Sequence, residues 1–175
     1  MPFIAKWPGV IKPGSKCSQL ICLTDIFKTC ADILNAEVPD NAALDSESFL
    51  PLLKGENIEL RNHVVHHSIK GKFAIRDKEW KLLLCQGSGG WTYNDADAYH
   101  DGLPPVQLYN MKNDPEEKKN IYKKHPEQVR KMIKMLEQFV TNGRSTPGSK
   151  QKNETIIDIW KLDDIGADKK ILDDL

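Results

Sequence analysis

Residues 64–85, VVHHSIKGKFAIRDKEWKLLLC, contain three short apolar runs in close succession. The runs cover 64–68, 73–76 and 80–85, and short polar turns separate them, the first of which contains Gly71. Runs of this length and composition, broken by turn residues, predict strands. Because a parallel crossover needs a dozen or more residues, the short connections favour antiparallel neighbours. This stretch therefore predicts most of a small antiparallel sheet.

A fourth strand and one long helix complete the predicted fold. Residues 106–110, VQLYN, have the character of another strand. Residues 126–142 predict a helix that begins at Pro126, a residue suited to the first helical position, and ends at Gly143. One face of this helix is apolar: Val129, Met132, Ile133, Leu136, Phe139 and Val140. We expect an α+β fold in which a four-stranded antiparallel sheet is packed by this long C-terminal amphipathic helix.

The first 40 residues predict a short strand and a helix that do not complete a core. Phe3-Ile4-Ala5-Lys6-Trp7 indicates a strand that ends at a Pro-Gly turn. Residues 24–36 predict a helix with Thr24 or Asp25 as its N-cap. Its apolar side chains form one stripe: Ile26, Phe27, Cys30, Ile33 and Leu34. The segment has the character of an edge of a larger α/β domain.

The last 23 residues form a polar tail. Residues 153–175 carry seven acidic and three basic side chains. Such a segment is mobile, or it is docked through its few apolar residues, and both alternatives remain open. The apolar residues are Ile156, Ile157, Ile159 and Trp160.

Charge and composition exclude several classes of function. The chain has 25 basic and 25 acidic side chains, which argues against nucleic acid as a partner. No apolar run approaches the roughly 18 residues of a membrane span.

Of the four cysteines, Cys30 and Cys85 lie in apolar patterns and are expected to be buried thiols. Cys17 and Cys22 could form a disulfide in an oxidising compartment, and the sequence leaves this open.

Three histidines form the most suggestive polar cluster. His66 and His67 are adjacent in a strand, so they point to opposite faces. His63 and His67 share a face, so a two-ligand metal site is conceivable, although it lacks a third ligand. A histidine that contacts substrate is a better interpretation than the metal site, and a structural or surface role is the alternative to both.

Other candidate binding residues lie in the second strand and the loop after the third. Arg76 and Lys81 could meet an anionic group, although charged strand residues are usually solvated. The glycine-rich loop 87–91 lacks the Lys and Ser/Thr of a nucleotide-binding loop. It is a flexible connection or a binding-loop tip that presents Trp91 and Tyr93 to a sugar.

Six segments, in order, resemble the C-terminal third of the formylglycine-dependent sulfatases. They are Pro2 to Gly9 with Ile11 to Gly14, Leu23 to Phe27, Asp45 to Gly55, Ala74 to Asp77 with Trp80 to Leu82, Leu108 to Asn120, and Gly143 to Gly148. His66-His67-Ser68 and Cys85 to Trp91 look most similar to bacterial arylsulfatase A-like members that act on sulfated glycans. The third segment departs from the family pattern in having Ser46 where Gly is usual.

The resemblance implies a division of the chain and a role for it. Residues 1–40 would be a remnant, strand and helix, of the catalytic α/β domain, 41–150 the C-terminal subdomain, and 151–175 a polar acidic tail. The family's nucleophile is a formylglycine made from Cys or Ser in a C/S-x-P-S/A-R motif, and a calcium ion neutralises the sulfate. No cysteine here is followed by that motif. The resemblance therefore implies no catalytic residue and no metal ligand in this chain, and places formylglycine and calcium in a preceding N-terminal domain.

The resulting hypothesis is a sulfatase C-terminal region that shapes a sulfated-carbohydrate pocket but is inactive alone. The residues expected to touch substrate are His66, His67, Arg76 and Trp91, and the expected partner is the N-terminal sulfatase domain. The alternatives are a stand-alone glycan-binding or interaction module and, third, a metal-binding protein that uses the histidines. Intact family members are commonly periplasmic or secreted, and residues 1–7 show no signal-peptide pattern, so the compartment is left open.

Overall fold

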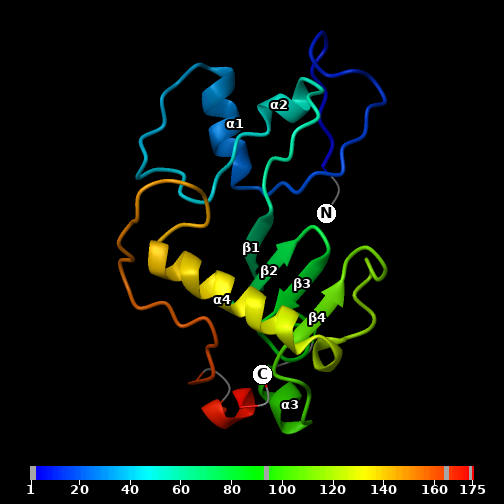
Figure 1. Ribbon diagram of the computed structural model, residues 1–175, viewed down its shortest axis with the longest axis vertical. Helices are drawn as coiled ribbons and strands as arrows, with labels where there is room; N and C mark the ends of the chain where they lie inside the picture. The colour runs from blue at the N-terminus through cyan, green and yellow to red at the C-terminus, as the bar shows by residue number, and fades with distance from the viewer. Residues whose placement is uncertain (1–2, 93–94, 164–165, 174) are drawn as a thin grey trace.

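A single four-stranded sheet organises the molecule. The computed structural model describes residues 3–92, 95–163, 166–173 and 175. The strands are β1 (His63–His67), β2 (Phe73–Asp77), β3 (Trp80–Leu83) and β4 (Gln107–Asn110), all antiparallel and in chain order across the sheet. The helix α4 (Pro126–Asn142) lies across one face (Figure 1). The predicted α+β architecture, a four-stranded sheet with this C-terminal helix, is confirmed.

The main core lies between the sheet and α4. Ile75 and Leu82, which pair across β2 and β3, have no exposed surface. Burial of each such side chain contributes about 1.5–3 kcal/mol. The other buried members are Leu84, Val106, Leu108, Val129, Met132, Leu136 and Ile159. The apolar side of the sheet and the apolar face of α4 thus pack against each other, as the sequence predicted.

The end of α4 follows from one glycine. Gly143 adopts the left-handed conformation with φ 65°, and its N–H is donated to the Val140 carbonyl. A side chain at this position would also collide with the backbone of Gln151. The predicted stop at Gly143 is therefore both conformational and steric.

The N-terminal part differs from the prediction in its strand. Segment 3–7 forms no strand in the described structure, because no described strand lies beside it to pair with. The turn after it does form, since the N–H groups of Val10 and Ile11 are donated to the Trp7 carbonyl. The helix α1 (Asp25–Ile33) follows, and the short helix α2 (Leu50–Leu53) comes before the sheet.

Helix α1 is turned so that its polar side faces inward. Asp25 and Thr29 are its buried residues, whereas Phe27 is 60% exposed and Leu34, just beyond the helix, is 76% exposed. Cys30 is also exposed, so the expectation of a buried thiol there is wrong, while Cys85 is buried as predicted. Amphipathicity identifies an apolar stripe, but it does not determine which side of a helix will find partners within the same chain.

Neither predicted cap of α1 forms as expected. Thr24 holds the N-cap position, yet its hydroxyl is donated to the Asp45 carbonyl at 3.1 Å. The Asp25 carboxylate instead accepts the N–H groups of Cys22 and Glu47, at 2.7 and 2.9 Å. Local capping therefore gives way to contacts with the loop that precedes α2.

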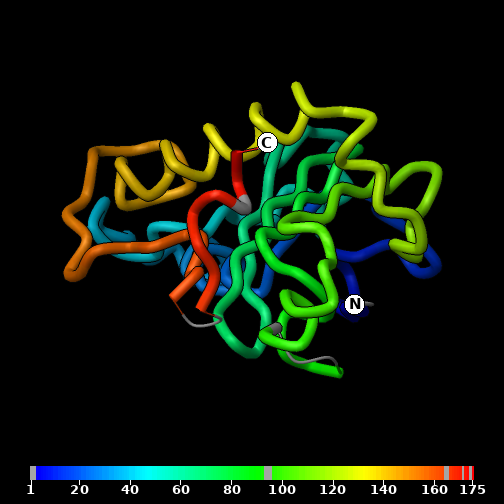
Figure 2. The backbone as a smooth tube through the Cα atoms, turned by 90° about the horizontal axis from the view of Figure 1, so that it is seen from below, coloured from blue at the N-terminus to red at the C-terminus, as the bar shows by residue number. Residues whose placement is uncertain are grey.

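The segment after α4 and the tail both return to the body of the molecule. Arg144 donates to the Asp40 carboxylate at 2.8 Å, and Ser145 donates twice to Asp45. Ile159 is buried in the main core, and Ile157 and Trp160 pack against it. Figure 2 shows the tail coming back to the sheet next to α4. The helical turn η1 (Tyr122–Lys124) precedes α4, and a second turn, η3 (Lys169–Leu172), lies near the C-terminus.

The connection between β3 and β4 contains a helix that the sequence did not predict. Helix α3 (Asp95–His100) occupies the middle of this connection. The helix has only six residues, which is too short for a recognisable 3.6-residue pattern. No helix in the described part of the chain is both long and apolar enough to cross a bilayer.

Candidate functional site: a cationic sheet face and an exposed tryptophan loop

The sheet face turned away from α4 carries two rows of side chains. Cross-strand pairing aligns Val64, Arg76, Lys81 and Tyr109 in one row. The second row is His66, Ala74, Leu83 and Gln107. Because side chains alternate along a strand, these rows lie opposite the core residues Ile75 and Leu82. We call this surface the cationic face.

Arg76 is the distinctive residue of the cationic face. It lies directly across from Lys81, and like charges in this position destabilise a sheet. The Lys81 ammonium is neutralised by Glu117, whose two carboxylate oxygens lie 2.6 and 2.8 Å from it. Arg76 makes no hydrogen bond or ion pair with any described residue, and its Nε is buried without a partner. The face therefore holds a guanidinium with unused donors, which is the group that best binds sulfate or carboxylate.

His66 is the next polar side chain on the cationic face. Burial lowers the pKa of its imidazole, and the nearby charges of Lys81 and Arg76 lower it further, whereas Glu117 acts in the opposite direction. His66 is therefore neutral at pH 7 and can both donate and accept a hydrogen bond. A neutral imidazole beside an unpaired guanidinium can hold a polyhydroxylated anion.

The other two histidines of the cluster lie on the α4 side of the sheet. His67 packs its ring edge-on against Phe73, with ring centroids 4.2 Å apart. His63 stacks on Phe139 at 4.4 Å, and its Nε2 donates to the Ser145 carbonyl at 2.7 Å. The structure thus brings His66 to Arg76 and separates His67 from both.

Trp91, the fourth residue expected to contact substrate, lies in the loop between β3 and α3. Its side chain is 74% exposed. The Gln107 amide, from the second row of the cationic face, donates to the Gly87 carbonyl at 2.7 Å and so joins this loop to the sheet. Tyr93, which the sequence paired with Trp91, lies outside the described residues.

Metal-binding side chains do not gather in groups of three or more among residues 3–92, 95–163, 166–173 and 175. The resemblance implies a calcium ion in a preceding domain, and we assign no residue of this chain to it and derive no step through it.

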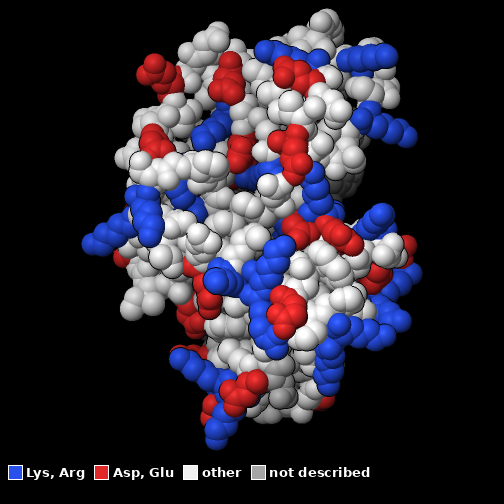
Figure 3. Space-filling model, viewed as in Figure 1, with Lys and Arg blue, Asp and Glu red and all other residues white. Residues whose placement is uncertain are grey.

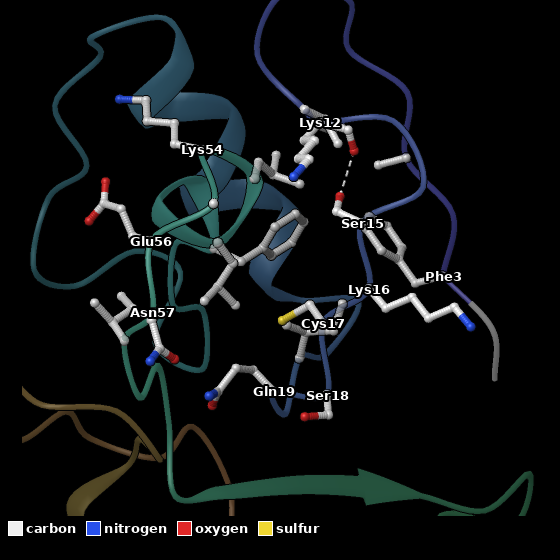
Figure 4. A pocket seen from close by; sticks show the side chains of 18 of the residues that line it. Phe3, Lys12, Ser15, Lys16, Cys17, Ser18, Gln19, Lys54, Glu56 and Asn57 are labelled. Atoms are coloured by element: carbon white, nitrogen blue, oxygen red, sulfur yellow. Dashed lines mark hydrogen bonds between the residues drawn. The ribbon is translucent and has the colours of Figure 1, made fainter.

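A cavity of about 860 Å³ lies in the N-terminal part, away from the cationic face. Phe3 and Phe49 meet edge-on there with ring centroids 5.4 Å apart, and Lys12, Lys16 and Lys54 line it (Figure 4). Its walls come from two segments, 3–21 and 49–58, that are distant in the chain, so no local sequence pattern indicates the cavity.

Charge elsewhere is mixed. Figure 3 shows acidic and basic side chains interspersed over the side of the molecule that carries α4. This distribution contrasts with the cationic face, where Glu117 is the carboxylate that interacts with Lys81 and His66 among the described residues.

Comparison with known proteins identifies the family. A family model described as N-sulphoglucosamine sulphohydrolase, C-terminal, matches residues 1–145. The chain belongs to this sulfatase family. The resemblance of its six segments to sulfatases is thereby confirmed.

The relatives include sulfatases of glycans. The chain is 34% identical over 142 residues to an N-acetylgalactosamine-6-O-sulfatase of Bacteroides thetaiotaomicron, a match that covers 81% of this chain and 27% of the relative. It is 32% identical to an ulvan-active sulfatase of Formosa agariphila, covering 69% of this chain and 28% of that protein. A solved structure from work on glycosaminoglycan metabolism by Bacteroides thetaiotaomicron superposes with a TM-score of 0.61 at 30% identity, covering 75% of this chain and 27% of that one.

The chain spans about a quarter of the length of these relatives, and the match is to their C-terminal region. The fold and the cationic face thus correspond to one region of those relatives. What this chain does is a matter for proposal.

Proposed function

We propose that this chain is the substrate-shaping C-terminal region of a sulfatase that hydrolyses sulfate esters of glycans, and that it is inactive alone. In this proposal, the formylglycine and the calcium ion belong to the part of a sulfatase that the match does not span. The observation that carries the proposal is Arg76 on the cationic face, whose guanidinium has no hydrogen-bond or ion-pair partner among the described residues. A structural arginine would be expected to have a carboxylate partner, as Arg61 and Arg144 do.

Arg76 and His66 would form one wall of the pocket. The guanidinium offers parallel donors to two oxygens of a sulfate or of a uronic carboxylate. The neutral imidazole of His66 would accept from a sugar hydroxyl or donate to a sulfate oxygen. We leave His67 out of this wall, because it lies on the α4 side and packs against Phe73.

The exposed apolar stripe of α1 fits a partner of large apolar surface. Leu23, Ile26, Phe27 and Leu34 remain at least 41% exposed, although Asp25 and Thr29 of the same helix are buried. Contiguous apolar surface of this kind marks an interaction site. We take the partner to be the catalytic α/β portion of the sulfatase, since the relatives carry about three times more chain than the matched region.

Replacement of Arg76 tests the role of the wall. Arg76→Met should lower the affinity of the chain for a tetrasaccharide that contains 6-O-sulfated N-acetylgalactosamine by about tenfold or more, measured by calorimetry. Its thermal stability should be equal or higher, because the repulsion from Lys81 is removed. The control is Arg130→Met, which removes an exposed arginine of α4 paired with Glu127. Unchanged affinity in Arg76→Met would overturn the proposed wall.

A stand-alone glycan-binding or interaction module remains a second candidate, because the core between the sheet, α4 and Ile159 is closed within this chain. A chain that stays monodisperse and unfolds cooperatively without a catalytic portion would favour the module. An aggregating chain that becomes monodisperse only with a catalytic portion would favour the sulfatase region.

A further inference from the structure

The loop that carries Trp91 is held in one conformation by contacts at its base. We call residues 87–92 the tryptophan loop. The Ser88 hydroxyl accepts the N–H of Thr92 at 2.8 Å, and Gln107 donates to the carbonyls of Cys85 and Gly87 at 3.1 and 2.7 Å. Gly89 and Gly90 have φ of 65° and 87°, a region that favours glycine. A constrained loop that exposes an indole is preorganised for binding.

The turn between β1 and β2 packs against this loop and places a lysine over the residue before Trp91. A Cβ at Gly89 would lie 2.7 Å from Cβ of Ser68, so the two backbones approach closely. At Gly90 a Cβ would collide with the aliphatic chain of Lys70, which therefore lies on the residue next to Trp91 in the chain. Lys70 is exposed, and no ion pair of its ammonium occurs among the described residues. An exposed aromatic residue and an available cation thus belong to two loops that pack against each other.

Gln107 connects the tryptophan loop to the cationic face. Its Oε1 accepts the hydroxyl of Tyr109 at 2.7 Å, while its amide nitrogen holds the loop. Tyr109 lies directly across from Lys81, the neighbour of Arg76. Arg76 and the start of β2 are three residues apart, about 10 Å along the strand, and the loop lies beyond that end. A ligand that contacts both Arg76 and Trp91 must therefore be longer than a single sugar.

We propose that the tryptophan loop and Lys70 form a second carbohydrate subsite, so that the ligand of this region is an anionic oligosaccharide that extends from Arg76 to Trp91. The Trp91 indole would stack on the apolar face of one sugar ring, and the Lys70 ammonium would pair with a sulfate or carboxylate on it. This inference rests on the proposed function for the class of ligand. It adds a subsite, a new contact residue and a minimum ligand length.

The test observes Trp91 directly by NMR. The signal of its indole N–H is assigned by its absence from Trp91→Phe, and Trp80 and Trp160 serve as internal references. The tetrasaccharide with 6-O-sulfated N-acetylgalactosamine should shift the Trp91 signal, whereas the 6-sulfated monosaccharide should not. An unmoved Trp91 signal at millimolar tetrasaccharide would overturn the proposal.

Two substitutions separate the indole from the ammonium. Trp91→Ala and Lys70→Met should each weaken tetrasaccharide binding by about tenfold and leave monosaccharide binding unchanged. Lys134→Met, an exposed lysine of α4, is the control and should bind as the unmodified chain does. A Trp91→Ala variant with the same tetrasaccharide affinity as the unmodified chain would overturn the subsite. So would a Lys70→Met variant that binds sulfated and desulfated ligands as the unmodified chain does.

Failure of this inference is distinguishable from failure of the proposed function. If Arg76→Met loses binding while the Trp91 signal stays still, the pocket wall stands and the second subsite falls. If the Trp91 signal moves while Arg76→Met binds normally, the subsite stands and the wall of Arg76 falls.

Discussion

Asp25 brings a carboxylate into the interior with no exposed surface, at the start of α1. It pairs with Arg61 at 3.1 Å and accepts the N–H groups of Cys22 and Glu47. Removal of one partner from a buried pair leaves an uncompensated charge. We therefore expect Arg61→Ala to lower the free energy of unfolding by about 3–5 kcal/mol, measured by urea denaturation.

The exposed pair of Lys78 and Glu59 provides the control for this prediction. Lys78→Ala should change stability by about 0–1 kcal/mol, because exposed pairs contribute little. Similar losses in Arg61→Ala and Lys78→Ala would contradict the role assigned to the buried pair.

His66 makes anion binding depend on pH. Its pKa lies below the ordinary value of 6.5, with burial as the main cause. The imidazole therefore gains its proton, and a positive charge, only as the pH falls below about 6.5. Tetrasaccharide affinity should rise as the pH is lowered through that region in calorimetric titrations, and His66→Gln should remove this part of the rise. His67→Gln, on the other side of the sheet, should keep it, and loss of the rise in that variant instead would contradict the assignment.

The strand pattern was sufficient to place Arg76 and His66 on one face of the sheet. Their positions alternate with the buried Ile75, and the turn lengths bring Lys81 opposite Arg76. The pairing of Lys81 with Glu117 joins residues 36 positions apart, so no local pattern reveals that, of the two, Arg76 lacks a partner among the described residues. The position of Lys70 over Gly90 is not predictable for the same reason, because it depends on how two loops pack.

At the scale of elements, α1 and α4 are both amphipathic, yet they use their apolar sides in opposite ways. The stripe of α4 is buried in the core of this chain, while that of α1 is exposed. The double substitution Phe27→Ser with Leu34→Ser should therefore leave the free energy of unfolding within about 1 kcal/mol, and should reduce aggregation in light scattering.

The matched substitution in α4 should behave differently. Leu136→Ala is expected to cost about 2–5 kcal/mol, because Leu136 is 1% exposed in the core. If the double substitution in α1 cost as much as Leu136→Ala, the stripe would have to be buried, in contradiction to the proposed interface.

Replacement of Gly143 should lower the free energy of unfolding for two separable reasons. Gly143→Ala forces a left-handed residue, which costs roughly 1–2 kcal/mol, and adds a collision with the Gln151 backbone. Gly102→Ala is the control, since Gly102 has φ 70° but nothing within 4 Å of the added carbon. Chemical denaturation should show a larger loss for Gly143→Ala, and equal losses would mean that the chain after α4 does not pack there.

The first and last residues of α4 were predicted correctly, because Pro126, the apolar stripe and Gly143 all indicate the same helix. The strand expected over 3–7 was wrong. Strand formation depends on which other segments are present to pair with this one, and periodicity carries no information on that. The side of α1 that finds partners depends on its neighbours in the same way, so its exposed stripe is informative about a partner.

Across the whole molecule, Asp40 and Arg144 connect the loop before α2 with the segment after α4. Arg144 and the Ser149 N–H lower the pKa of the Asp40 carboxyl from its ordinary 3.8. A carboxylate with a lowered pKa stabilises the fold above its ordinary pKa, and this stabilisation is lost as the pH falls through the lower, folded value. The difference in denaturation midpoint between the unmodified chain and Asp40→Asn should therefore shrink as the pH falls below about 3.8. A difference that does not change with pH would show that the Asp40 carboxylate is not held by these contacts.

The central claim is that this chain shapes a sulfatase pocket and does not itself cleave the ester. Incubation of the purified 175-residue chain with a chromogenic aryl sulfate tests it most directly, with Arg76→Met prepared in parallel to detect contaminating enzymes. We expect no release of chromophore above the buffer rate for either protein. Turnover by the unmodified chain that is weakened in Arg76→Met would contradict it, because the chemistry would then reside in these residues.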